Sequence, residues 1–361
     1  ASAAPGASQD AEPQEAAPPP LESAMRLLLA AASLLATSAE TPRRLRVVNG
    51  CASEPLWVAH MAAARTGPDP QDVRIEPLQH HDFQTPDNLK ATRYWPKMGC
   101  GATGGDCAIG DSGGPQESCV IRRHGGDDYS RCAPPVDSKF EASFGVNGKP
   151  CNPQTPEGVE MEGCDYIDVS LVDGYTLPLK LEIRGDCTDS RTDKPVEQID
   201  CSSLSLDTCP TQERLSHAGM TVNLQAVNPR THRVSGCYSP CGRLLDTKWV
   251  GQLEIGGLPP SDPRAQYYCC PTPPITPEAC RAGPIEHTQY VDLVRSRCKG
   301  AYSYAYDDAN GLLRCSSASQ YVLTYYCPTA GGPAGMVAAV WAANATAAAF
   351  LAPAAAPRDG L

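Results

Sequence analysis

The sequence predicts a mostly β fold stapled by disulfides, and three observations lead to that class. The 361 residues include 35 prolines and 31 glycines, too many turn formers for a helical bundle. Short alternating apolar runs recur between residues 47 and 328, and no long stretch there has apolar residues at helical spacing. The 18 cysteines are even in number and include no C-x-x-C pair, which favours disulfides over zinc. An oxidising compartment follows from this cysteine usage.

The strand predictions rest on turn signals that bound the alternating runs. Cysteines are densest between Cys187 and Cys298, so we expect a loop-rich subdomain there, with one short helix, interrupting a β-sandwich. The adjacent residues Cys269 and Cys270 must crosslink two separate loops, because a disulfide between neighbours is strained. The predicted strands are residues 138–144, 166–172, 176–183, 249–255 and 321–326.

The N-terminal region differs in composition from the body. Residues 1–24 carry four acids, no basic residue and much Ala and Pro, which predicts a disordered extension or sequence translated upstream of a start at Met25. Residues 25–39 combine Met25-Arg26 with an apolar run and a small-residue cleavage pattern that ends at Ala39, as in a signal peptide. Secretion is the direct expectation.

Residues 329–361 form an Ala-dominated tail with two open interpretations. One is a flexible tail, and the other is a GPI-anchor signal or a membrane segment. Alanine is barely apolar, and Asn344 and Thr346 interrupt the run. A C-terminal anchor is the only membrane association that we expect.

The net charge limits the partners. Of the formal −11, residues 1–24 contribute −4 and Arg26 contributes +1, so the body carries −8. A negative body disfavours nucleic acid and anionic lipid as partners and allows neutral sugars. We expect a monomer that holds neither a metal nor a cofactor.

Three motifs are specific in combination: residues 168–175 (DVSLVDGY), 268–270 (YCC) and 301–307 (AYSYAYD). On these motifs the chain resembles the thaumatin-like proteins of the pathogenesis-related and osmotin-like type, over nearly the whole of residues 40–328. The resemblance implies a flattened β-sandwich, a disulfide-rich second domain over about 187–298 and a small third loop domain. It also implies a cleft between the first two domains.

The resemblance implies a set of disulfides as well. Where the family usually has Gly-Asp-Cys-Gly-Gly, this chain has Ser112 in place of the cysteine, so Cys119 lacks its usual partner. We predict that Cys119 pairs with Cys132, and that Cys151 pairs with Cys164. The pairs implied by the resemblance are Cys51–Cys327, Cys100–Cys107, Cys187–Cys315, Cys201–Cys298, Cys209–Cys237, Cys241–Cys269 and Cys270–Cys280.

Residues 110–115 read GDSGGP, the segment that surrounds the nucleophile of trypsin-like serine proteases. A serine nucleophile needs a histidine base and an orienting aspartate. His60, His80 and His81 lie upstream without the usual sequence setting, and the chain has no room there for a first barrel. We therefore interpret Ser112 as a former cysteine in a tight glycine turn, and the chain as no serine protease.

Four acids match, position by position, the carboxylates that line the family's cleft: Glu141, Asp168, Asp173 and Asp307. Clustered carboxylates can accept hydrogen bonds from sugar hydroxyls, and mutual repulsion raises the pKa of one member so that it can act as an acid. Glu141 would then donate the proton in glycoside hydrolysis, with Asp168 or Asp173 as base or nucleophile. The turn at Asp173 has to reorient that residue, because a straight strand places it and Asp168 on opposite faces. Taken singly, each acid is also explained as a turn or surface residue.

Tyrosines near these acids are candidate platforms for sugar rings. Tyr166 and Tyr175 flank the acidic strand, and with Tyr304 and Asp307 they are the predicted ligand contacts. Packing of the rings inside the sandwich is the alternative. The tyrosines expected on one face of a common strand are Tyr302, Tyr304 and Tyr306.

The resemblance implies one basic residue a few positions before Trp95. Asp87 occupies the best-aligned position, and Lys90 and Arg93 are the substitutes. If neither serves, the cleft is more acidic than is usual in the family.

The resemblance implies a secreted or cell-surface protein that binds β-1,3-glucan-type polysaccharide in an acidic cleft, in defence or in contact with cell walls. Two other functions stay open. One is an endo-β-1,3-glucanase that uses the paired carboxylates, and the other is a membrane-perturbing antifungal protein.

Overall fold

The computed structural model describes residues 41–63, 65–117, 132–152, 162–247, 249 and 256–328. The N-terminal extension, the signal-like segment and the C-terminal tail lie outside these ranges, as does most of the strand expected at 249–255.

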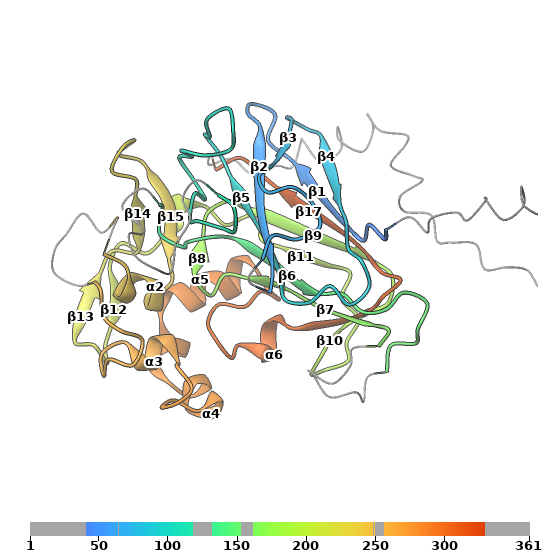
Figure 1. Ribbon diagram of the computed structural model, residues 1–361. Helices are drawn as coiled ribbons and strands as arrows, with labels where there is room; N and C mark the ends of the chain where they lie inside the picture. Colours follow the sequence, from blue (N-terminus) through green and yellow to red (C-terminus); the bar gives the residue numbers. More distant parts are fainter. Residues whose placement is uncertain are drawn as a thin grey trace, which may run out of the picture. The chain divides into compact units, whose positions relative to one another are not determined.

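Two large β-sheets form the framework (Figure 1). Within each sheet neighbouring strands are antiparallel, except that β1 and β17 run parallel. The five-stranded sheet has the order β11(Gln198–Asp200), β9(Leu179–Arg184), β17(Gln320–Tyr325), β1(Leu45–Asn49) and β4(His80–Phe83). The seven-stranded sheet has the order β10(Cys187–Asp189), β16(Leu313–Ser316), β7(Cys164–Ser170), β6(Lys139–Ser143), β5(Thr92–Lys97), β2(Leu56–Ala62) and β3(Val73–Ile75).

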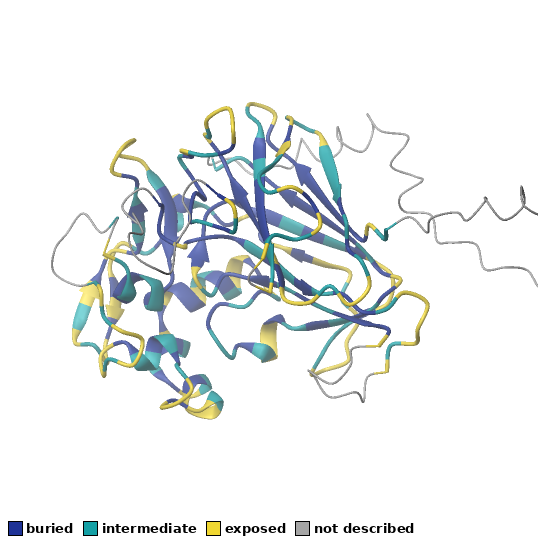
Figure 2. Cartoon of the chain, in the orientation of Figure 1, coloured by how far each residue is buried: buried dark blue, intermediate teal, exposed yellow. Residues whose placement is uncertain are grey.

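Alternation of apolar and polar residues sets the register of the central strands. Along β6 the buried residues are Phe140 and Ala142, and the residues between them are half-buried. The same two-residue period runs along β9. Because a one-residue slip would turn every apolar side chain outward, this pattern fixes which side chains face the core. Figure 2 shows the buried strands against exposed loops.

The core of the sandwich is rich in aromatic rings. The Phe140 ring centroid lies 6.0 Å from that of Tyr321 on the other sheet and 6.2 Å from that of Tyr94. A buried polar contact also links the sheets, since Arg44 Nη1 and the Tyr321 hydroxyl each donate to Asp165 at 2.9 Å. Burial raises the pKa of the Asp165 carboxyl to about 6.

The disulfide-rich part holds short strands and more helix than the single short helix expected. The longest helix among the described residues, α5(Gln289–Arg297), begins where Thr288 Oγ1 accepts the Val291 N–H, and it buries Tyr290, Val291 and Val294. The sequence signal was weak because nine residues give only two and a half turns of helical period. The other strands are β8(Gly174–Tyr175), β12(Glu213–Leu215), β13(Met220–Val222), β14(Gln225–Val227) and β15(Val234–Tyr238). The other helices are α2(Pro240–Leu245), α3(Gln266–Cys269), α4(Pro277–Arg281) and α6(Asp308–Gly311), with 3-10 turns at Leu206–Thr208 and Pro284–His287.

Eight disulfides join the described residues. They comprise the seven pairs implied by the resemblance together with the predicted Cys151–Cys164 pair. Cys132 is also disulfide-bonded. Its predicted partner Cys119 lies outside the described residues.

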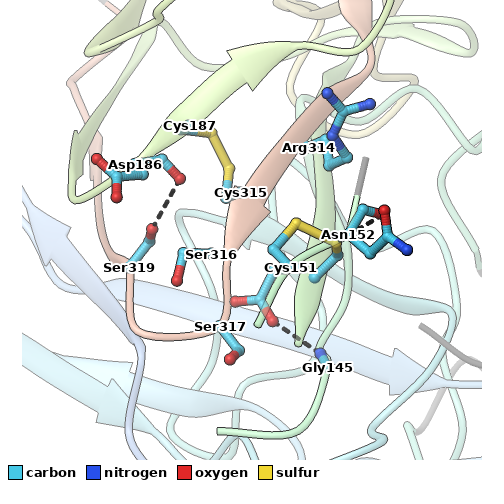
Figure 3. The surroundings of a disulfide bond; sticks show 12 residues. Gly145, Cys151, Asn152, Asp186, Cys187, Arg314, Cys315, Ser316, Ser317 and Ser319 are labelled. Atoms are coloured by element: carbon cyan, nitrogen blue, oxygen red, sulfur yellow. Dashed lines mark hydrogen bonds between the residues drawn. A yellow bond between two sulfur atoms is a disulfide. The ribbon is translucent and has the colours of Figure 1, made fainter. Parts of the chain in front are cut away.

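One corner of the seven-stranded sheet shows how these bonds reinforce strand pairing (Figure 3). Cys187 on β10 and Cys315 on β16 are direct cross-strand partners and are bonded to each other. Beside them the Ser319 hydroxyl donates to the Asp186 carbonyl oxygen at 3.3 Å. The pairing and the crosslink together hold the edge strand β10 on the sheet.

Candidate functional site

The outward face of the seven-stranded sheet carries a row of charged residues. Glu141 on β6 is paired with Arg93 on β5 and with Asp168 on β7. Residues directly opposite each other project from the same face, with Cβ atoms about 4.5–5.5 Å apart. We call these three residues the charged row.

The charged row remains accessible to solvent. Arg93 Nε lies 2.5 Å from Glu141 Oε1, with the side chains 52% and 25% exposed. Asp168 is half-buried. Because an exposed ion pair contributes about 0–1 kcal/mol to stability, folding alone gives little reason for this arrangement.

Asp173 is brought back to the same face by a turn. β7 ends at Ser170, and the Gly174 N–H donates to the Leu171 carbonyl at 3.1 Å. Gly174 has a φ of +121°, and an added Cβ would lie 2.2 Å from a carbonyl oxygen, so the turn requires glycine. Asp173 then contacts Lys139, which is two residues before Glu141 on β6.

Lys139 is a site residue that the sequence reasoning missed. Its ammonium group contacts Asp173, and its side chain is 11% exposed. Burial alone would lower the pKa of Lys139, but the Asp173 and Asp137 carboxylates outweigh it and raise the pKa. The sequence could have indicated Lys139, because it lies two residues before Glu141 and residues at that spacing share one face of a strand.

The GDSGGP segment covers the neighbouring part of this face. The Ser112 hydroxyl donates to Asp137 Oδ2 at 2.8 Å, and both residues are buried. His60 Nε2 lies 2.9 Å from the Pro70 carbonyl, and in the described part of the chain no histidine contacts Ser112. A serine nucleophile is paired with a histidine base in such proteases, whereas the described residues place a carboxylate beside Ser112.

Asp137 makes stability depend on pH. Burial raises its pKa from 3.8 to about 7. Between these values the folded state binds the proton that the unfolded state releases, so this stabilising contribution is complete below pH 3.8 and disappears as pH rises through 7. The wild type should therefore lose about 2 kcal/mol of unfolding free energy between pH 5 and pH 7 through this group, and Asp137→Asn should not show that loss. Urea unfolding at both pH values measures this loss, and an identical loss in the wild type and the variant would contradict the assignment.

Three of the predicted ligand contacts are buried in the structure. Asp307 is 1% exposed and accepts hydrogen bonds from Arg295 Nη2 at 2.9 Å and from the Ser303 hydroxyl at 2.5 Å. Tyr175 is 1% exposed, and its hydroxyl donates to the Ser205 carbonyl. Tyr304 is 3% exposed, and its hydroxyl donates to a carboxylate. A sugar cannot reach these groups without rearrangement, so we leave them out of the site.

Tyr166 stays a predicted ligand contact. It is half-buried, lies two residues from Asp168 on β7 and pairs with Ser143 and Arg314. The tyrosine strand expected at residues 301–307 is absent there, since Tyr302 forms only an isolated bridge and Tyr306 has a φ of +69°.

The basic partner of Glu141 is Arg93. Asp87 instead accepts the Asn147 N–H at 3.1 Å and lies 3.6 Å from Arg44 Nη2. Arg93 occupies the place beside Glu141 because β5 pairs with β6 at that register.

Neither metal binding nor a membrane span is indicated by the residues that the structure describes. Among them no group of three or more His, Cys, Asp and Glu side chains is arranged to hold a metal ion. None of the helices in these residues is long and apolar enough to cross a bilayer.

The fold and the site define a disulfide-rich β-sandwich protein with clustered carboxylates on an outer sheet face. The chain belongs to the thaumatin family, whose sequence profile matches residues 147–328. It is 26% identical to Thaumatin-like protein 1b of Malus domestica over 65% of this chain and 82% of that protein. It is 26% identical to Thaumatin-like protein 1 of Arabidopsis thaliana over 79% and 86% of the two chains.

Two further proteins are named for glucan cleavage. Glucan endo-1,3-beta-glucosidase of Prunus avium is 27% identical over 65% of this chain and 71% of that protein. A GH family 64 laminaripentaose-producing beta-1,3-glucanase from Paenibacillus barengoltzii, solved with laminarihexaose, is 11% identical. It covers 81% of this chain and 78% of its own at a TM-score of 0.39, too low to establish a shared fold.

Proposed function

We propose that this chain is a secreted protein that binds β-1,3-glucan-type polysaccharide on the charged row. The carrying observation is that Arg93, Glu141 and Asp168 share one accessible sheet face. Carboxylates accept hydrogen bonds and a guanidinium donates them, so together they complement the adjacent hydroxyls of a sugar ring. Tyr166, beside Asp168, offers an apolar ring for the sugar face.

Two further facts support the proposal. A relative 27% identical to this chain is named Glucan endo-1,3-beta-glucosidase, which makes a β-1,3-glucan a reasonable ligand class. The eight disulfides among the described residues are typical of an oxidising, extracellular setting.

Hydrolysis is the second candidate function. Glu141 and Asp168 are direct cross-strand partners, and retaining glycosidases hold two carboxyl groups about 5–5.5 Å apart. Against this, Arg93 forms an ion pair with Glu141 and Lys139 forms one with Asp173, so the proposed acid and one proposed nucleophile are already held by cations. We therefore favour binding over cleavage.

Co-sedimentation with an insoluble β-1,3-glucan tests the proposal. We expect Glu141→Gln and Asp168→Asn each to weaken binding at least tenfold, because each removes a charged acceptor. The matched control is Glu182→Gln, since Glu182 is a half-buried carboxylate 3.2 Å from Lys180 on β9 of the other sheet.

The same samples, assayed for reducing ends on laminarin, separate the two functions. Retention without released sugar supports the binder. Turnover that Glu141→Gln abolishes supports the hydrolase. If neither occurs on any β-1,3-glucan tested, or if all three variants behave alike, the charged row is not a glucan site.

A further inference from the structure

A pocket lies beside the loop closed by the Cys100–Cys107 disulfide, and none of its lining residues belongs to the charged row. It has a volume of about 320 Å³ and is lined by that loop, by Asp111, by the tip of the β14–β15 hairpin and by Trp249. Ligand pockets start at about this size, which gives room for one sugar ring and not for a long oligosaccharide.

The pocket is held in shape by contacts of its own walls. Asn228 is fully buried, donates to the Ala108 carbonyl at 3.1 Å and accepts the Arg230 N–H at 2.8 Å. Arg230 Nη2 donates to the Cys107 carbonyl at 2.8 Å. The hairpin tip is therefore fixed on the disulfide loop without a ligand.

A buried carboxylate, Asp111, is among the residues that line this pocket. Asp111 is 4% exposed, and its Oδ2 accepts the Cys107 N–H at 3.2 Å. Its Oδ1 accepts no hydrogen bond within the described part of the chain and has only an ion pair with Lys97 Nζ at 3.6 Å. A buried acceptor without a donor is costly, and a ligand hydroxyl would satisfy it.

The remaining groups indicate the class of ligand. Trp249 is half-buried and supplies a flat aromatic surface. Arg230 is 54% exposed at its side chain and has five N–H donors, more than its contacts with Cys107 and Asp106 use. A cationic ligand would be repelled by Arg230, and an anionic one by Asp106 and Asp111. The lining therefore favours a neutral ligand. A vicinal diol can donate to the carboxylate and accept from the guanidinium at once.

We propose that this pocket binds a single neutral hexose unit through Trp249, Arg230 and Asp111. The site is separate from the charged row and does not depend on the function proposed for that row.

Isothermal titration of the full chain with D-glucose tests the proposal. We expect saturable binding with a dissociation constant in the millimolar range, weakened at least tenfold in Arg230→Met and in Trp249→Leu. Arg233→Met is the matched control, because Arg233 is an exposed arginine on the same hairpin that does not line the pocket. Thermal melting checks that each variant is folded.

Glucuronate and glucosamine, which carry opposite charges on the same ring, test the electrostatic argument. We expect both to bind more weakly than glucose. Absence of saturable glucose binding, unchanged binding in both folded pocket variants, or tighter binding of either charged sugar would overturn the proposal. Loss of glucose binding in Glu141→Gln alone would also overturn it, because it would assign the sugar to the charged row.

Discussion

Replacing Lys97 with methionine is expected to lower the free energy of unfolding by about 3–5 kcal/mol. Lys97 is fully buried on β5, and its ammonium contacts Glu117, lies 2.7 Å from Asp72 Oδ1 and lies 3.6 Å from Asp111 Oδ1. Burial alone would lower the pKa of Lys97, but Glu117 and Asp72 outweigh it and raise the pKa. The methionine would fill the same space and leave these carboxylates without their cation.

Chemical denaturation in urea at pH 7 measures this change. The control is Lys180→Met, which removes a partly exposed lysine 3.2 Å from Glu182 and is expected to cost less than about 1 kcal/mol. Equal losses in the two variants would show that the buried cation is no more important than a surface one.

The second large effect is expected from removal of the Cys201–Cys298 disulfide. This bond joins the residue after β11 to the C-terminal end of α5 across 97 positions, and both cysteines are fully buried. Chain-entropy theory assigns about 4.7 kcal/mol to a loop of roughly 100 residues. We therefore expect the double serine variant to lose about 4–5 kcal/mol of unfolding free energy.

The bond between Cys100 and Cys107 provides the comparison. Its sequence separation is 7, for which the same theory gives about 2.5 kcal/mol. In urea unfolding, the double serine variant of Cys201 and Cys298 should lose clearly more unfolding free energy than the double serine variant of Cys100 and Cys107. The reverse order would mean that local strain, and not closure of the unfolded chain, governs these crosslinks.

The acids of the candidate site were taken from the resemblance, and local sequence features explain only part of how they are arranged. Strands were predicted at 138–144 and 166–172, and the structure pairs them so that Glu141 and Asp168 lie directly opposite each other. The odd spacing between Asp168 and Asp173 correctly required a turn that reorients Asp173. The need for that turn follows from strand period alone, whereas the choice of these acids depended on the resemblance.

The remaining site residues depended on partners that are distant in the sequence. The residues around Asp307 give no indication that Arg295 will donate a hydrogen bond to it. Those around Tyr175 give no indication that its hydroxyl will donate to the Ser205 carbonyl. Tyr304 is likewise buried by its contact with Glu286. Whether a polar group is buried depends on the tertiary structure. A sequence motif can therefore identify a residue without showing whether a ligand can reach it.

A double-mutant cycle on Glu141 and Asp168 tests the central claim most directly. Calorimetric titration with a laminarin oligosaccharide would be performed on the wild type, Glu141→Gln, Asp168→Asn and the double variant. If the adjacent carboxylates bind one sugar segment, the double variant should lose clearly less affinity than the two single losses added together. Fully additive losses, or no loss at either position, would contradict a common glucan site on this sheet face.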